Sequence, residues 1–246
     1  MRAVVLGSSS GIGRETALVL AAAGADVIVH ARRSVEAALA VADECTRLSG
    51  GRSSVLMADL GDRAAGDLLV EKAWNVWGGL DAWLHLAGAD TLTGPQAKAG
   101  FEAKLDLLWE VDVVSTMRLC RAVGRKMQAQ GSGSIVTVGW DQAETGMEGD
   151  SGELFAAAKG AVMAFTRSLA LSLAPIVRVN NVAPGWIQTA WGEQASDVWQ
   201  QRVLRETPLK RWGKPNDIAQ ACRFLVGPSA SFLTGQILRV NGGVVR

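Results

Sequence analysis

The sequence lacks tyrosine altogether and is poor in histidine and cysteine: its 246 residues include no Tyr, two His and three Cys. Without tyrosine, no phenol can donate a proton in any reaction that the protein performs. His30 and His85 are too few for a histidine-based metal centre, and we expect no bound metal. The three cysteines, Cys45, Cys120 and Cys222, lie far apart, and their odd number argues against a secreted disulfide framework.

An excess of either charge is also missing. Lys and Arg number 25 and Asp and Glu number 24, so the formal net charge is +1, which gives no electrostatic footprint for nucleic acid or an anionic membrane. No uninterrupted apolar run approaches the ~18 residues of a membrane span, and Arg14 and Glu15 interrupt the amino-terminal stretch too early for a signal peptide. We therefore expect a soluble, cytoplasmic protein whose partner is a small molecule, with no nucleic acid and no membrane.

What the sequence does have is a regular alternation of short β-branched runs and longer helical patterns. The predicted strands cover residues 3–6, 27–29, 54–57, 83–86, 134–138, 177–182 and 237–240. The predicted helices cover residues 12–23, 35–48, 64–77, 101–128, 152–173 and 216–226. Apolar strands that are each followed by a helix predict a parallel sheet covered on both faces. We therefore predict one doubly wound α/β domain spanning residues 1–246, with 186–206 as a possible lid because it fits neither period.

A glycine-rich segment joins the first predicted strand to the first predicted helix. Glycine permits a tight turn and lets the backbone approach a pyrophosphate, whose charge the helix N-terminus then favours. Strand, glycines and helix in this order are the context that a dinucleotide-binding loop requires. The alternative is an ordinary glycine-rich turn. The predicted phosphate-binding residues are Gly7, Ser9, Ser10, Gly11, Ile12 and Gly13.

The end of the second predicted strand carries two arginines and no carboxylate. An NAD-selective site of this architecture uses a carboxylate there to hold the ribose 2′-hydroxyl. Arg32 and Arg33 instead offer guanidinium groups suited to a 2′-phosphate. The sequence therefore favours NADP(H), with NAD(H) possible. The alternative is a solvated arginine pair at the start of a helix.

Further landmarks follow in order along the chain: Asp59-Leu60, Ala87-Gly88, Ala-Ala-Ala-Lys159-Gly-Ala-Val, Pro184-Gly185-Trp-Ile187-Gln-Thr189 and Gly242-Gly243. With the glycine loop, they make the whole chain resemble a short-chain dehydrogenase/reductase. The resemblance implies a Rossmann fold with a seven-stranded parallel sheet, a nicotinamide dinucleotide over the strand ends, and a homo-oligomer, either tetramer or dimer. The cofactor contacts that it implies beyond the glycine loop and the arginines are Asp59, Leu60, Ala87, Gly88, Lys159, Pro184, Gly185, Ile187 and Thr189.

The catalytic positions depart from that family. There, a tyrosine stands four residues before the lysine, a spacing that puts both on one helix face; here that position is Phe155. The serine expected after the strand 134–138 is Trp140, and an asparagine of the preceding long helix is Asp112. Of these positions only Lys159 is kept. The resemblance therefore implies dinucleotide binding but not the usual proton transfer, for which acid catalysis contributes ~10²–10⁴-fold.

Three hypotheses concern the altered site. Asp141 or Glu144, with a pKa raised by burial, could transfer the proton instead, the alternative being a solvated acidic loop. The Asp112 carboxylate could pair with Lys159, whose charge is costly to bury alone. Trp140, Phe155, Trp186 and Trp191, with Met147 nearby, could cluster around a flat, apolar or aromatic ligand, or could simply fill volume. His85 is expected to be a hydrogen-bonded structural histidine.

Three functions remain open at this point. The first is an NADP(H)-dependent oxidoreductase for a carbonyl or alcohol, in which Lys159, an acidic side chain or an ordered water moves the proton. The second is a non-catalytic dinucleotide-binding sensor or structural subunit. The third is a lyase or isomerase that uses the pocket without net hydride transfer.

Overall fold

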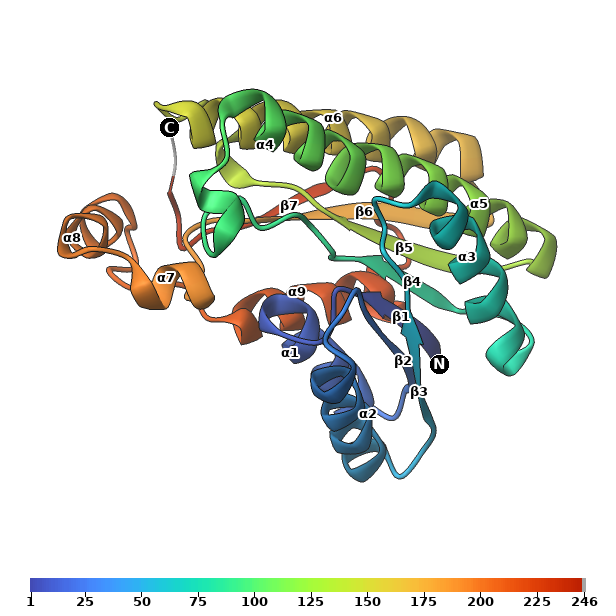
Figure 1. Cartoon of the computed structure of the whole chain (residues 1–246). Helices are drawn as coiled ribbons and strands as arrows, with labels where there is room; N and C mark the ends of the chain where they lie inside the picture. Colours follow the sequence, from blue (N-terminus) through green and yellow to red (C-terminus); the bar gives the residue numbers. More distant parts are fainter. Residues whose placement is uncertain (245–246) are drawn as a thin grey trace.

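The computed structural model describes residues 1–244 as one α/β layered fold (Figure 1). Its seven strands pair in parallel in the order β3-β2-β1-β4-β5-β6-β7. The sheet confirms the predicted fold class, and every predicted strand forms with ends shifted by a few residues at most. The strands are β1 (Arg2–Leu6), β2 (Asp26–Ala31), β3 (Ser53–Met57), β4 (Ala82–His85), β5 (Gly133–Val138), β6 (Val177–Pro184) and β7 (Ile237–Val240).

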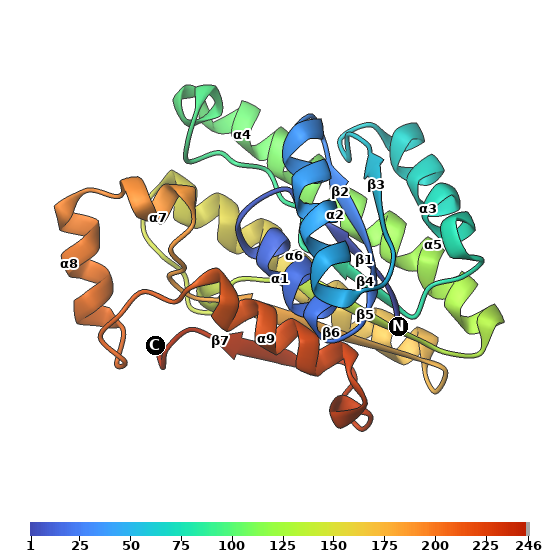
Figure 2. The same ribbon diagram turned by 90° about the horizontal axis from the view of Figure 1, so that it is seen from below.

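Helices cover both faces of this sheet (Figures 1 and 2). One face is covered by α1 (Gly11–Ala22), α2 (Val35–Ser49) and α9 (Pro215–Val226). The other face is covered by α3 (Arg63–Trp77), α4 (Phe101–Leu108), α5 (Ser115–Gln130) and α6 (Asp150–Leu173). Short 3-10 turns lie at Pro95–Lys98, Asp141–Ala143 and Pro228–Ala230.

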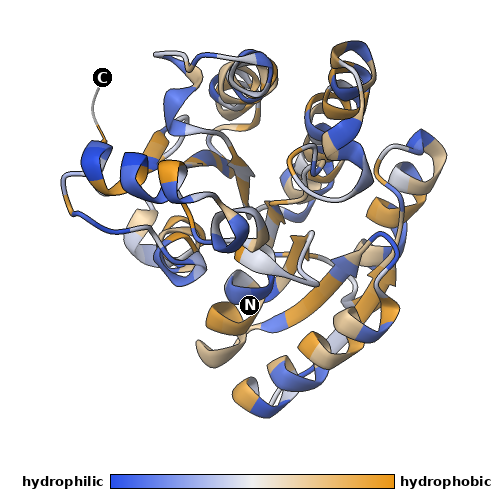
Figure 3. Cartoon of the chain, turned by 60° about the vertical axis from the view of Figure 1, so that its left-hand side comes forward, coloured by the Kyte–Doolittle hydropathy of each residue, from blue (hydrophilic) through white to orange (hydrophobic). Residues whose placement is uncertain are grey.

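Strand β1 shows why both layers are needed. Ala3 and Val5 belong to the core cluster shared with α1, α2 and α9, whereas Val4 and Leu6 belong to the cluster shared with α3, α5 and α6. Successive side chains of a strand point to opposite faces, so an uninterrupted apolar run is buried only where both faces are covered. Figure 3 shows the same division, with hydrophobic strands inside and hydrophilic residues on the outer helix surfaces.

The predicted helix over residues 101–128 is interrupted. Between α4 and α5, the segment Trp109–Val114 is a π-helix, η2. This wide turn includes Asp112, whose side chain is buried. Single π turns of this kind often occur at functional sites. The interruption was not visible in the apolar periodicity, which runs on through it.

The segment 186–206, expected to fit neither period, contains two helices. They are α7 (Ala190–Gln194) and α8 (Asp197–Glu206), and they project beyond the carboxyl ends of the strands at the left of Figure 1. The segment therefore stands where a lid over the strand ends would be.

Helix α6 is long and apolar enough to span a membrane by length and composition alone. In the fold, its buried residues pack against the sheet: Leu169, Ala170 and Leu173 join the same core cluster as Val177 and Val179 of β6. This packing accounts for its apolar composition as that of a core helix.

Candidate active site

The strand order reverses between β1 and β4, and ligands of open α/β sheets bind at the carboxyl ends of the strands beside such a reversal. The glycine loop begins there. Gly7 has φ +74°, and a Cβ at this position would lie 2.7 Å from the Cα of Ala87, which follows β4. A Cβ on Gly13 would lie 2.2 Å from the carbonyl oxygen of Gly7. The turn is therefore packed so tightly that only glycine fits at either position.

The first turn of α1 faces outward from this loop. Its N-cap residue, Ser10, makes no side-chain capping hydrogen bond, and Ser10 and Gly11 are exposed. A Cβ on Gly11 would be 3.9 Å from the methyl group of Thr189, so the loop after β6 faces the glycine loop. Uncapped amides at a helix N-terminus with no side chain in front of them suit a pyrophosphate. The residues present therefore fit a dinucleotide.

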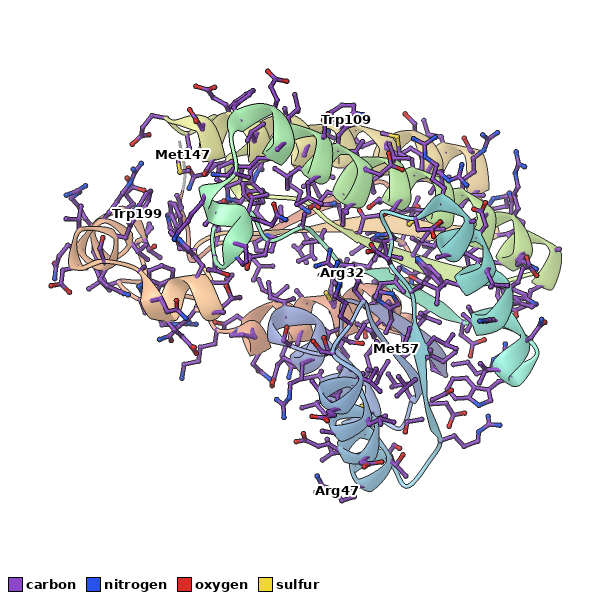
Figure 4. All side chains as sticks on the ribbon, viewed as in Figure 1. Arg32, Arg47, Met57, Trp109, Met147 and Trp199 are labelled. Atoms are coloured by element: carbon purple, nitrogen blue, oxygen red, sulfur yellow. The ribbon has the colours of Figure 1, made fainter. Side chains whose placement is uncertain are left out.

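The ends of β2 and β3 lie next to this loop. The carboxyl ends of the strands and the loops that follow them are together called the cleft. Arg32 and Arg33 are exposed and unpaired within residues 1–244, and Arg32 extends toward the middle of the view in Figure 4. Asp59 follows β3, and its Oδ1 accepts a hydrogen bond from the amide of Gly61 at 3.0 Å. Leu60 is buried beside it. Two free guanidinium groups and an ordered carboxylate thus lie at these strand ends.

Polar side chains in register form a row just inside the sheet. His85 of β4 pairs with Thr137 of β5, which pairs with Asn181 of β6, so all three project to the same face. Asn181 Nδ2 donates to Thr137 Oγ1 at 2.7 Å, and His85 Nε2 lies 3.2 Å from Ser115 Oγ. Burial lowers the pKa of His85 to about 3, so this residue is a neutral, hydrogen-bonded structural histidine, as expected.

Lys159 and Asp112 form a buried ion pair. Lys159 Nζ lies 2.6 Å from Asp112 Oδ2, with side-chain exposures of 9% and 1%. Asp112 Oδ1 accepts a hydrogen bond from the amide of Ala89 at 2.7 Å, which ties the carboxylate to the segment after β4. The predicted pairing is confirmed. A buried charge requires such a partner, because an uncompensated one is strongly destabilising.

Phe155 and Trp140 stand beside this pair. Phe155 lies one helical turn before Lys159 on α6 and packs with the cluster that includes Leu108 and Leu154. Trp140 follows β5, and its ring meets that of Phe155 edge to face with centroids 6.3 Å apart. Neither side chain is a proton acid: phenylalanine has no ionisable group, and the indole N–H only donates a hydrogen bond.

The expected single aromatic cluster is wrong, because the structure divides it in two. Trp186 stacks on Trp191 with centroids 6.0 Å apart, and both also contact Trp199 and Trp212. Met147 packs with this second group, and Figure 4 shows Met147 and Trp199 on the side of the molecule that carries α8. The four tryptophans pack against one another, which leaves the Trp140–Phe155 pair as the aromatic part beside Lys159.

The acidic loop after β5 is attached to β7. Asn241 Nδ2 donates to Asp141 Oδ2 at 3.1 Å, and Glu144 accepts hydrogen bonds from Arg167 at 2.8 Å and from Arg239. The proton-transfer role expected of Asp141 stays a prediction. The hydrogen bond from Arg167 is the main cause of a pKa of Glu144 below its ordinary value. The hypothesis of Glu144 as an acid with a raised pKa is therefore wrong.

Comparison with known proteins agrees with this geometry. A family model described as enoyl-(acyl carrier protein) reductase matches residues 7–245. A 3-oxoacyl-[acyl-carrier-protein] reductase from Synechocystis is 34% identical, covering 99% of this chain and 96% of the relative. The 7α-hydroxysteroid dehydrogenase of Escherichia coli is 33% identical, covering 99% and 94%. The chain belongs to the short-chain dehydrogenase/reductase (SDR) family.

Solved SDR structures are similar over the whole chain. A 7α-hydroxysteroid dehydrogenase in complex with NADH and 7-oxo glycochenodeoxycholic acid has a TM-score of 0.89 at 33% identity, covering 99% of this chain and 94% of the other. A variant of a Serratia marcescens short-chain dehydrogenase/reductase has a TM-score of 0.89 at 32% identity, covering 99% of this chain and 97% of the other. SDR oxidoreductases of this kind bind a nicotinamide dinucleotide.

The remaining residues predicted to contact a cofactor follow strands β4 and β6. Gly88 follows β4, and a Cβ there would be 2.9 Å from Asp112 Oδ2. Pro184 is the last residue of β6, and Gly185, Ile187 and Thr189 lie in the loop that follows it. Within residues 1–244, no three His, Cys, Asp or Glu side chains are grouped as metal ligands.

One residue of this cleft, His30, was not predicted from the sequence. His30, in β2, is buried, and its ring is hydrogen-bonded to the glycine loop. The available signal was a polar residue inside the apolar run of the second strand, immediately before Ala31 and Arg32.

Proposed function

We propose that the protein is an NADP(H)-binding SDR oxidoreductase for a carbonyl or alcohol substrate that operates without the family's tyrosine and serine. The observation that supports it most strongly is the glycine turn, closed by Gly7 and Gly13 and open at the first turn of α1. Such a turn binds phosphate through backbone amides and needs none of the side chains at positions 140 and 155.

The two arginines support the choice of NADP(H) over NAD(H). Arg32 and Arg33 follow β2 directly, and both guanidinium groups are exposed. Ala31 before them is buried and has no carboxylate to hold a ribose 2′-hydroxyl. A guanidinium group matches the geometry of a phosphate and binds it with charge-assisted hydrogen bonds.

The proton must come from a group other than a phenol. Bound NADP(H) would supply or accept the hydride. Glu144 is bonded to Arg167, and Asp141 accepts a hydrogen bond from Asn241, whereas Lys159 lies one helical turn after Phe155 on α6. In carbonyl reduction, Nζ of Lys159 would give its proton to the substrate oxygen directly or through a water. The Asp112 carboxylate would hold the Lys159 side chain in place while solvent returns the proton.

A second candidate is a non-catalytic dinucleotide-binding protein, acting as a sensor or structural subunit. The observation in its favour is the 2.6 Å ion pair, because the Lys159 side chain is already engaged by the Asp112 carboxylate and would have to leave it to reach a substrate oxygen. The edge-to-face contact of Trp140 and Phe155 also supports it, because neither ring offers a hydroxyl group to a substrate oxygen.

We propose a substrate that is apolar or aromatic, because the half-buried rings of Trp140 and Phe155 would contact its body. A homo-oligomer, tetramer or dimer, is proposed on the basis of large apolar residues exposed on α4 and at its end, Phe101 and Trp109, which are 38% and 45% exposed. Light scattering of the purified chain tests the oligomer. Cell fractionation tests the proposed cytoplasmic location.

The decisive experiment has two stages. Titration with NADPH and NADH, followed by tryptophan fluorescence, tests cofactor binding, and tighter binding of NADPH is expected. A panel of ketones and alcohols then compares the unmodified protein with Phe155→Tyr/Trp140→Ser. Turnover by the unmodified protein that is lost in Lys159→Met supports the oxidoreductase. Turnover by the double variant alone supports the non-catalytic protein, and absence of NADPH and NADH binding contradicts both.

A further inference from the structure

His30 lies under the glycine loop and is hydrogen-bonded to it through both ring and backbone. Gly7 N–H donates to His30 Nδ1 at 3.1 Å. His30 N–H donates to Ser8 Oγ at 3.0 Å, and Ser8 N–H donates to the carbonyl oxygen of His30 at 2.9 Å. The residue is 2% exposed. The start of the glycine turn is therefore bonded to β2 at three points.

The other ring nitrogen reaches a different strand. His30 Nε2 lies 3.2 Å from the carbonyl oxygen of Ala58, the residue before Asp59. Gly7 N–H is a donor and the Ala58 carbonyl is an acceptor, so a single neutral tautomer, with its hydrogen on Nε2, satisfies both. Burial lowers the pKa of His30 to about 4, which keeps this tautomer neutral at physiological pH.

The ring thus connects three segments of the cleft. Gly7 begins the phosphate loop, Ala58 leads into Asp59 and Leu60, and His30 itself is followed by Ala31 and Arg32. No other side chain within residues 1–244 bonds both to the glycine loop and to the end of β3. An apolar side chain at this position would leave the partly buried Gly7 amide and the buried Ala58 carbonyl without their histidine partner, which costs more than the bonds themselves contribute.

We propose that His30 is a positioning residue for the cofactor: it fixes the glycine loop, the end of β2 and the end of β3 in the arrangement that receives the adenosine and phosphate half of the dinucleotide. This inference rests on the proposed dinucleotide binding. It assigns His30 no contact with the reacting atoms. Replacement of His30 is therefore expected to act on affinity for that half of the cofactor.

His85 provides a matched control. It is also fully buried, lies at the end of a strand next to β1 and has a lowered pKa. Its ring, however, faces Ser115 and Cys120 of α5, at 3.2 Å and 4.0 Å. A change at His85 therefore removes a buried imidazole without removing a hydrogen bond to the glycine loop.

The experiment compares His30→Met, His30→Gln and His85→Met. Binding of NADPH and of adenosine 2′,5′-bisphosphate is measured by calorimetry, and unfolding by circular dichroism. His30→Met is expected to weaken both ligands at least about tenfold, because two buried backbone groups lose their partners. His30→Gln, whose amide can both accept from Gly7 and donate to Ala58, is expected to restore most of the affinity. His85→Met is expected to lower stability without changing either affinity.

The possible failures are distinct. If the unmodified protein binds neither compound, the proposed function fails. If it binds both and His30→Met binds them equally well, the positioning role of His30 is contradicted. If His30→Met does not fold, NMR of the two histidines in the unmodified protein decides: saturation with adenosine 2′,5′-bisphosphate should shift the ring signals of His30 more than those of His85. Equal or absent shifts would contradict the proposal.

Discussion

The amino-terminal part of the cleft, at β1 to β3, and its carboxy-terminal part, at β5 and α6, are built on one sheet but work with different chemical groups. At β1 to β3 the site consists of backbone amides, close-packed Gly7 and Gly13, and arginines at the rim. At β5 and α6 it consists of the Lys159–Asp112 ion pair and two aromatic rings. The first part offers main-chain amides and guanidinium groups, whereas the second offers one ammonium group, one carboxylate and two rings that carry no proton acid.

The difference illustrates that phosphate binding and proton transfer depend on different features of a fold. A phosphate is held by main-chain N–H groups, which every residue carries, so sequence change is tolerated provided that the turn keeps its shape. Proton transfer needs a particular side chain with a suitable pKa at a particular atom. Cofactor binding can therefore persist where the usual acid is absent, and the predictions below probe the two parts separately.

The largest effect is expected at the ion pair of the carboxy-terminal part. Lys159→Met would leave the Asp112 carboxylate buried without its cation, which costs about 3–5 kcal/mol of stability. The double variant Lys159→Met/Asp112→Asn removes both charges. The side-chain oxygen of the asparagine can still accept the hydrogen bond from the Ala89 amide. The double variant is therefore expected to recover most of the loss in urea unfolding. Equal free energies of unfolding for the single and double variants would contradict a coupled pair.

The amino-terminal part should respond most strongly to closure of the glycine turn. Gly13→Ala places a methyl group 2.2 Å from the Gly7 carbonyl oxygen, so the turn must move. Overpacking of this kind costs about 1–3 kcal/mol, and the affinity for NADPH is expected to fall about 10- to 100-fold. Gly100→Ala is the control, because a Cβ there meets nothing within 4 Å. Unchanged NADPH affinity in Gly13→Ala would show that the dinucleotide binds elsewhere.

A smaller effect is expected at the rim of the same part. Arg32→Ser/Arg33→Ser removes the guanidinium groups and is expected to reduce the preference for NADPH over NADH about tenfold, the value of one charge-assisted hydrogen bond. NADH affinity itself should change little. Arg47→Ser serves as the control, since Arg47 lies at the far end of α2, away from the cleft (Figure 4). An unchanged ratio of the two dissociation constants would mean that the arginines are merely solvated.

The fold was predictable from the sequence because its signals are local. The alternation of apolar runs and helical patterns identifies strands and helices, and parallel order follows from that alternation. The wide turn at Trp109–Val114 was not predictable, because its altered hydrogen bonding leaves the apolar pattern unchanged.

The site was predictable only in part. The pairing of Asp112 with Lys159 could be predicted because the two residues stand at the positions of the helical asparagine and lysine of the SDR family. The orientation of Asp141 toward Asn241 depends on a contact between residues 100 positions apart, and the bond between Gly7 and His30 depends on strands meeting side by side. Neither contact can be predicted from a local sequence pattern.

The smallest effect is expected at Glu144, where the acidic loop meets β7. Because the Arg167 hydrogen bond lowers its pKa, the charged form stabilises the fold above the unfolded-state pKa of about 4.3, and this contribution is lost as the pH falls through the lower, folded-state value. Glu144→Gln should therefore reduce stability at neutral pH, by only a few tenths of a kcal/mol because the side chain is 34% exposed and screened by solvent.

The difference in stability between Glu144→Gln and the unmodified protein should become smaller in acid, where the Glu144 carboxylate is also neutral. Thermal unfolding at a series of pH values measures this difference. NADPH binding and any turnover should be unchanged, since Glu144 is bonded to Arg167 and Arg239. A change in the pH dependence of turnover would instead make Glu144 the proton donor and would move the reacting centre from Lys159 toward β7. The part of the cleft that carries the chemistry would then lie at β7 and not at the Lys159–Asp112 pair.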